Sequence, residues 1–261
     1  MTTAGISLLS LPILLLFSSL ASLPLAKSPL PLNPAMQAVA PPDCLWFASS
    51  SGFAEANFES DNQSEQLLAE PEVRQFGNRI QEQILLAVRR NAGSEHKERV
   101  LSSELPKLFK AMLSRPFVVY VEDVQLVDEG VRIAAGLVID AGKDRDEIQQ
   151  AFDRLLELKG DDAPPIRTIE SKGVTWSAAR KSMDKPEVRW GWRDNYFLLA
   201  FGDGTADTIV ERMQGPPPGW LDNLRREHPV ERESSLGYLN VAIVLDRLKP
   251  ILDGENAWHV V

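Results

Sequence analysis

The spacing of apolar residues changes near residue 115, and this change limits the possible folds more than any other feature of the chain. Before it, two segments carry apolar residues at every third or fourth position, which is the spacing of one helix face. These residues are Val73, Phe76, Ile80, Ile84 and Val88, and then Leu101, Leu105, Leu108, Met112 and Leu113. After it, residues 117–121 are β-branched or aromatic, and residues 131–139 alternate apolar side chains with others beyond a turn at 128–130. The pattern therefore predicts two helices followed by a β-hairpin.

The rest of the chain continues in short segments of both kinds. Asp144 and Glu147 form a capping-box-like helix start, with Ser102 or Ser103 proposed as the N-cap of the helix before. Consecutive hairpins imply a mostly antiparallel sheet, and apolar helix stripes need a face to cover. The predicted fold class is therefore α+β, a mostly antiparallel sheet with helices packed on it, in a single domain over residues 43–261. Its other elements are strands at 44–49, 166–170, 174–179, 187–193, 196–201 and 237–241, and helices near 205–213, 220–224 and 242–252.

Residues 1–26 carry no charged side chain, and residues 6–20 form an apolar block of signal-peptide length. Small-x-small sequences ending at Ala21 and at Ala40 fit a cleavage site. Because no Lys or Arg precedes the apolar block, an uncleaved membrane anchor is the alternative, and 26 uncharged residues are enough to span a bilayer. Both interpretations predict an exported protein, either periplasmic, at the cell surface or secreted, or anchored to the membrane by residues 1–26.

Both flanks of the predicted domain carry unusual sequence. Residues 27–42 contain five prolines and are expected to form an extended linker. Residues 257–261 contain a tryptophan and two valines, a strand-like composition at a chain end where polar residues are usual. We therefore also consider the hypothesis that the chain is the N-terminal part of a longer protein.

The charge of the chain excludes one class of partner. Its formal net charge is −9, from 28 Lys and Arg against 37 Asp and Glu. An acidic surface is repelled by phosphate backbones, so nucleic acid is not an expected partner. The same repulsion disfavours anionic lipid, which leaves the N-terminal segment as the expected membrane contact.

The residue types that carry catalysis or bind metals show no recognisable pattern. Cys44 is the single cysteine, and it is expected to pack as a small buried side chain. His96, His228 and His259 lack the spacing of a ligand pair. The turn at residues 202–205 (GDGT) follows a strand and opens a helix, as some anion sites do, but it lacks the dinucleotide and P-loop patterns and is interpreted as a turn with a helix cap. We predict no catalytic residue, no metal site and no cofactor.

One group of residues suggests a binding surface. Trp190 and Trp192 lie on one face of a predicted strand, Trp176 lies on a neighbouring strand, and Arg189 and Arg193 point to the other face. A sugar ring stacks on exposed tryptophans, so the group is a candidate platform for a glycan. The competing interpretation is a core layer of large side chains.

Three stretches of the chain give it a family resemblance. They are residues 42–47 (PDCLWF), a proline–acid entry into the first strand; residues 67–76 (LLAEPEVRQF), an acid–proline helix start; and residues 196–202 (YFLLAFG) with Trp220, Leu221 and residues 238–241 (YLNV). The chain resembles a family of exported bacterial proteins of unknown function over residues 42 to about 252. The resemblance implies a periplasmic or surface α+β ectodomain, often longer than this chain, and carries no catalytic residue.

These observations lead to one main hypothesis of function. The chain is expected to be a non-enzymatic cell-envelope or secreted protein that binds an unidentified protein or glycan. One alternative is a secreted hydrolase that acts through carboxylates distant in sequence. The other is carbohydrate binding through surface tryptophans.

Overall fold

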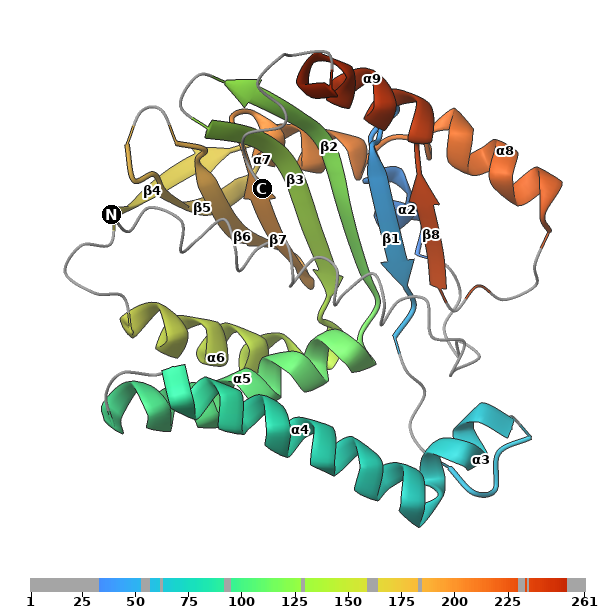
Figure 1. Ribbon diagram of the computed structural model, residues 1–261, viewed down its shortest axis with the longest axis vertical. Coiled ribbons are helices and arrows are strands. Elements are labelled where there is room, and N and C mark those ends of the chain that lie inside the picture. Colours follow the sequence, from blue (N-terminus) through green and yellow to red (C-terminus); the bar gives the residue numbers. More distant parts are fainter. Residues whose placement is uncertain are drawn as a thin grey trace.

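The computed structural model describes residues 33–52, 57–61, 63–91, 95–127, 130–158, 164–182, 185–229, 233 and 235–252. The fold is α+β, as predicted, with one antiparallel sheet in the strand order β4-β5-β6-β7-β3-β2-β1-β8 and helices on both faces (Figure 1). The strands are β1 Trp46–Ser50, β2 Phe117–Val127, β3 Gly130–Asp140, β4 Ile166–Ser171, β5 Val174–Ala179, β6 Val188–Arg193, β7 Tyr196–Phe201 and β8 Ser235–Leu239. The helices are α2 Pro34–Ala38, α3 Gln63–Ala69, α4 Pro71–Asn91, α5 Glu95–Ser114, the 3-10 turn η1 Gly142–Asp144, α6 Arg145–Glu157, α7 Thr205–Arg212, α8 Gly219–Glu227 and α9 Val241–Leu252.

Because successive strand residues point to opposite faces, the apolar residues of the sheet divide into two cores. On one face, Phe152 and Leu156 of α6 pack against a cluster that contains Phe117, Ile139 and Phe197. Helices α5 and α4 lie beyond α6, and the three helices are seen together below the sheet in Figure 1. On the other face, α2 and α7 cover a second cluster, whose sheet residues include Phe47, Val118, Tyr120, Val138 and Leu198.

A glycine makes room for one of the largest buried side chains of the second core. Tyr120 on β2 is opposite Gly136 on β3, and a Cβ added at Gly136 would lie 2.6 Å from the Tyr120 ring. The register then shifts between Val121 and Asp123, so that Glu122 lies at a β-bulge. The Arg212 guanidinium of α7 lies 5.5 Å from the centre of the Tyr120 ring and pairs with Glu122 at 2.6 Å, which joins α7 to the middle of the sheet.

The interpretation of residues 27–42 as an extended linker is wrong for its described part. Residues 34–38 form helix α2, and Met36, Val39 and Ala40 are buried in the second core. Asn33 caps this helix, since its side-chain oxygen accepts a hydrogen bond from the Ala35 amide at 3.1 Å. An Asn followed by Pro is a helix-start signal, and the prolines around it concealed that signal.

Two other helix predictions need correction. Helix α5 begins at Glu95, so Ser102 and Ser103 lie inside it and do not cap it. The start of this helix was predicted from its apolar stripe, which only its later turns carry. Its first residues are charged helix formers and show no such stripe. Helix α3 was not predicted. The start of α4 at Pro71, the β2–β3 hairpin, strands β4–β7 and helix α6 lie where the sequence pattern put them, within a few residues.

The predicted signal peptide or anchor and the strand-like residues 257–261 lie outside the described residues. Among the helices that are described, none is both long enough and apolar enough to cross a membrane.

Candidate functional site

The three tryptophans of the candidate platform do not share a face of the sheet. Trp176 is opposite Gly191 in the β5–β6 register and is fully buried in the core beneath α7. Trp190 is 9 % exposed on the opposite face, with its ring 5.9 Å from that of Phe152 in α6. Trp192 is half-buried on that same face, beside the Phe197 ring and under the Arg145 guanidinium. A platform made from all three indoles is therefore not formed, and the burial of Trp176 and Trp190 supports the core interpretation.

The two arginines of the platform hypothesis lie on the α7 face and are used within the fold. Arg193 donates a hydrogen bond from Nη1 to the Val210 carbonyl of α7 at 3.1 Å. Arg189 donates from Nε to the Glu187 carboxylate. Neither guanidinium flanks Trp190 or Trp192, because alternate residues of β6 point to opposite faces.

Arg189 belongs to a larger group of charged side chains at the β4–β6 end of the sheet. The Glu187 side chain is only 4 % exposed, and it accepts a hydrogen bond from Arg167 Nη2 at 2.9 Å as well as that from Arg189. Arg180 Nη2 lies 4.0 Å from the Glu187 carboxylate and also pairs with Asp203. We call Arg167, Arg180, Glu187, Arg189 and Asp203 the Glu187 cluster.

Strand register explains how the Glu187 cluster assembles. Arg167 on β4 is opposite Ala178 on β5, and Ala178 is opposite Arg189 on β6. The short Ala178 side chain leaves space in which the two arginines reach Glu187. Sequence reasoning identified Arg189 but missed Arg167, Arg180 and Glu187. The position of Arg167 could have been predicted from the tight turn at residues 172–173, because that turn fixes the register that places Arg167 opposite Ala178.

A hollow of about 220 Å³ lies beside the Glu187 cluster. It forms because the β3–β7 pairing ends at Ala135 and Phe201, whereas β3 continues to Gly130. Gly202 lets the chain pass close to β3, since a Cβ there would lie 2.8 Å from the Ile133 carbonyl oxygen. Asp203 stands in the wall of the hollow and also pairs with Arg180, so it joins the hollow to the cluster. The lining residues are Asp123, Gln125, Arg132, Ile133, Ala134, Lys185, Pro186, Gly202 and Asp203.

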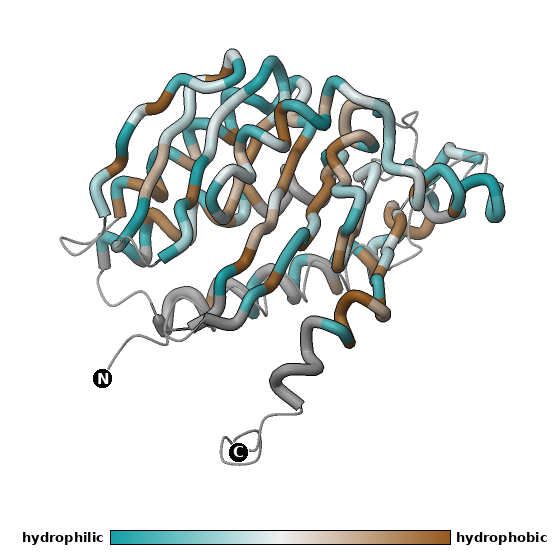
Figure 2. The backbone as a smooth tube through the Cα atoms, turned by 90° about the horizontal axis from the view of Figure 1, so that it is seen from above, coloured by the Kyte–Doolittle hydropathy of each residue, from teal (hydrophilic) through white to brown (hydrophobic). Residues whose placement is uncertain are grey.

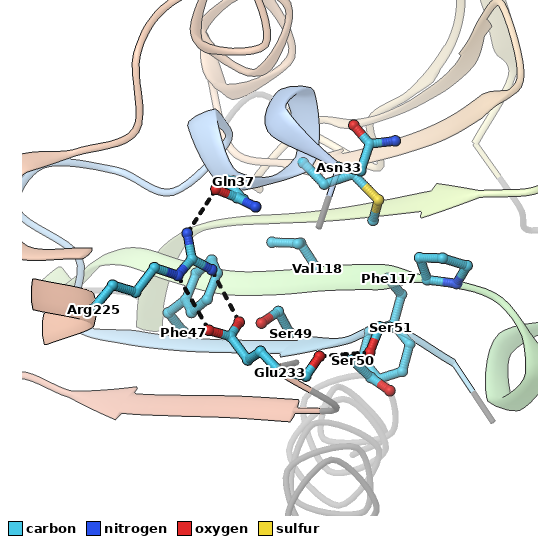
Figure 3. A pocket seen from close by; sticks show the side chains of 12 residues that line it. Asn33, Gln37, Phe47, Ser49, Ser50, Ser51, Phe117, Val118, Arg225 and Glu233 are labelled. Carbon is cyan, nitrogen blue, oxygen red and sulfur yellow. Dashed lines mark hydrogen bonds and ion pairs between the residues drawn. The ribbon is translucent and has the colours of Figure 1, made fainter. Parts of the chain in front are cut away.

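A second, smaller pocket lies between α2, β1, β2 and α8 (Figure 3). Arg225 lines this pocket and forms two hydrogen bonds with the Glu233 carboxylate, at 2.9 and 3.1 Å, and a third with the Gln37 side chain at 2.7 Å. The pocket volume is about 40 Å³, which holds only water-sized molecules. Its polar groups are therefore used to hold α2 against the sheet.

Each of the three buried carboxylates in the described part of the chain is paired with at least one cation. Glu104, Glu187 and Glu233 are buried, and Glu104 is held by Lys107 and Arg154, both at 2.9 Å. Burial alone would raise the pKa of Glu104, but hydrogen bonds from Lys107, Arg154 and Ser103 hold that pKa below its ordinary value. A hydrolase of the two-carboxylate type needs one acid with a raised pKa. The contacts of Glu104 instead favour its ionised form.

Cys44 is buried, as expected from the sequence. Burial raises the pKa of its thiol to about 12. The thiol donates to the Trp46 carbonyl at 2.9 Å. Since the thiolate is the reactive form, Cys44 is inert at neutral pH. His96 and His228 are exposed, and no three His, Cys, Asp or Glu side chains of the described residues are grouped as metal ligands.

Exposed apolar side chains gather where β8 passes into α9. Leu239, Val241 and Leu245 are each more than half exposed, at 55, 54 and 57 %. Asn240 caps α9 by accepting a hydrogen bond from the Ile243 amide at 3.2 Å, which fixes the direction of the helix directly after the strand. Val241 and Leu245 are four residues apart and share one helix face. We call Leu239, Val241 and Leu245, with the outer edge of β8, the β8–α9 surface.

Comparison with known proteins adds little. No family model matches the chain, and no curated protein matches it significantly. A GTP-binding regulator from Thermotoga maritima is similar to it at 10 % identity over 38 % of this chain, with a TM-score of 0.23. The match covers 62 % of that chain, less than two thirds of its length, and a TM-score this low carries no argument.

Proposed function

We propose that the protein is exported and acts, without catalysis, by binding another polypeptide at the β8–α9 surface. The observation that carries this proposal is the exposure of Leu239, Val241 and Leu245 at one end of the sheet. Apolar side chains gathered in this way mark interaction sites on soluble proteins.

The β8 strand supplies a way to hold an extended segment. It pairs with β1 on one side over five residues, and no other described strand pairs with it. An edge strand presents backbone N–H and C=O groups that pair with an added strand. A bound segment would thus gain main-chain hydrogen bonds from β8 and apolar contacts from the adjoining helix.

Helix α9 extends this surface. Of its 12 residues only Asp246, Arg247 and Lys249 are charged, and its first residues are apolar at the end of β8 (Figure 2). A helix this apolar is normally covered on more than one side. Burying the exposed halves of Leu239, Val241 and Leu245 would contribute about 2–4 kcal/mol to binding. The occupant that fits is therefore an extended apolar segment of another protein.

Site-specific photo-crosslinking in the native host tests this proposal. We expect a photoreactive residue at Leu239 or Leu245 to yield an adduct with one and the same protein, and Val241→Asp to abolish that adduct. Phe76 is the matched control, because it is 65 % exposed and apolar but belongs to helix α4, which lies at the bottom of the view in Figure 1, whereas α9 lies at the top. Equal crosslinking from Phe76 would contradict a specific surface, and an adduct of two copies of this chain would replace the proposed partner with self-association.

Export is tested in the same cells. The protein should fractionate with the periplasm, the cell surface or the medium, and its residues before 33 should be removed or embedded in the membrane. A chain that begins at Met1 in the cytoplasmic fraction would overturn this part of the proposal. Carbohydrate binding is less well supported, because Trp176 and Trp190 are buried.

A further inference from the structure

We propose that the hollow beside Asp203 binds a small ligand with a carboxylate or phosphate group, and that this group takes the place of Asp203 on Arg180. The hollow shares no residue with the β8–α9 surface, from which strand β1 separates it. It is therefore independent of the function proposed above and adds a ligand to it.

The charge of this corner favours an anion. Among the described residues that line the hollow or form the Glu187 cluster, five cationic side chains stand against three acidic ones, in a chain whose net charge is −9. Arginine guanidinium groups bind planar oxyanions through paired N–H donors, which is why such clusters recognise carboxylate and phosphate groups. The cations are Arg132, Arg167, Arg180, Lys185 and Arg189, and the acids are Asp123, Glu187 and Asp203.

The two carboxylates of the Glu187 cluster differ in how easily they leave it. Glu187 is almost fully buried and held by both Arg167 and Arg189, so it is a permanent part of the fold. Asp203 is 71 % exposed and pairs with Arg180 alone. Solvent screens an exposed pair of this kind, so an external anion can compete with Asp203. The Asp203 carboxylate thus stands where the oxyanion of a ligand would lie.

The chain around Asp203 suits such an exchange. Gly202 and Gly204 flank it with φ angles of 100° and 78°, in the region that glycine alone visits readily. The Gly202 amide donates to the Glu187 carbonyl at 2.9 Å, which holds the turn in place. The exposed Asp203 side chain can leave Arg180 by rotation about its own bonds while β7 and α7 stay fixed on either side. The hollow of about 220 Å³ is smaller than the pockets of drug-sized ligands, and it suits a molecule of the size of phosphate or citrate.

Calorimetric titration of the whole chain with inorganic phosphate, and separately with citrate, tests the proposal. We expect Asp203→Asn to bind the preferred anion about two- to fivefold more tightly than wild type, because removing the internal carboxylate frees Arg180. Arg180→Gln should weaken binding by about tenfold or more. The anion that responds identifies whether phosphate or carboxylate is the preferred group.

Asp194→Asn is the matched control. Asp194 is an exposed acid in the β6–β7 turn with φ 52°, a conformation that asparagine also tolerates, and its removal changes the net charge equally. The proposal is overturned if Asp194→Asn tightens binding as much as Asp203→Asn does. It is also overturned if neither anion binds wild type or Asp203→Asn at millimolar concentration. Should Arg180→Gln not fold, the comparison of the two Asp→Asn variants decides alone.

Discussion

The two ends of the sheet differ in how they protect an edge strand from pairing with another chain. At the β4–β6 end, charged side chains turn inward and satisfy one another around Glu187. At the β8 end, the edge strand is short and apolar side chains face solvent. Ion pairs protect an edge from adventitious strand pairing, whereas exposed leucine and valine invite it. This difference underlies our proposal that the β4–β6 end contributes to stability and the β8 end to binding.

The β1–β8 end takes its stability from a segment that the sequence analysis set aside. Residues 33–41 lie across β1 and β2, and side chains from distant parts of the chain hold them. Arg225 bonds the Gln37 side chain at 2.7 Å, and Trp220 donates to the Pro41 carbonyl at 2.9 Å. Asn33 donates to Asp140 at 3.1 Å. This segment, together with α8, closes a core that would otherwise be open to water.

The largest expected effect comes from removing that segment. A chain that starts at residue 41 should lose at least about 4 kcal/mol of unfolding free energy, because Met36, Ala38, Val39 and Ala40 leave the core. A loss of this size is comparable with the whole stability of a domain, so the truncated chain is expected to be largely unfolded. Urea unfolding followed by tryptophan fluorescence measures it.

A chain that starts at residue 33 is the control and should unfold like the full chain. Equal stability of both truncations would show that α2 is dispensable. The result also bears on processing. Cleavage after Ala40 would remove core residues, so a mature protein that keeps this fold is expected to be cut at Ala21 or elsewhere before residue 33.

A second prediction compares how much one side chain at each end of the sheet contributes to the free energy of unfolding, and the expected effects are smaller. Glu187→Ala should cost about 1–3 kcal/mol, because it leaves Arg167 and Arg189 close together without their shared carboxylate. Leu245→Ala should change stability by less than about 0.5 kcal/mol, since Leu245 is exposed. Chemical denaturation of both variants gives the two values. Similar costs for both would mean that the ends do not differ as proposed.

The sequence predicted the elements of this fold better than their arrangement. Alternation and helical stripes are local, so β2, β3 and α4 could be located from them. The neighbours of a strand are not local. Nothing in the sequence pattern shows that β3 pairs with β7, 56 residues on from Asp140 to Tyr196, or that β1 lies between β2 and β8. The register of neighbouring strands is hidden in the same way. Trp176 and Trp190 were grouped because β5 and β6 are neighbours, but Trp176 is opposite Gly191 and so belongs to the other core.

The candidate sites were harder still to predict. Arg180 and Asp203 are 23 residues apart, and their meeting depends on where β5 and β7 end. The turn that contains Asp203 was noted as a weak anion motif, but its structural partner is an arginine from a strand two places away in the sheet. The turn at residues 172–173 fixes the β4–β5 register, but the rest of the cluster, formed across further strands, leaves no signal at a fixed spacing.

The smallest expected effect is the loss of stability in Asp203→Asn. Its size tests whether the Asp203 carboxylate can leave Arg180 at little cost. At low salt, Asp203→Asn should cost about 0.2–1 kcal/mol, because it removes an exposed partner of Arg180. At about 1 M NaCl, where the Debye length falls to about 3 Å, the cost should disappear. Urea unfolding at the two salt concentrations measures both values, and Leu245→Ala serves as an uncharged control that salt should leave unchanged. A cost above about 1 kcal/mol that persists in high salt would make Asp203 as structural as Glu187. The proposed anion site requires that Glu187 is fixed and that Asp203 can be displaced, and this result would contradict that requirement.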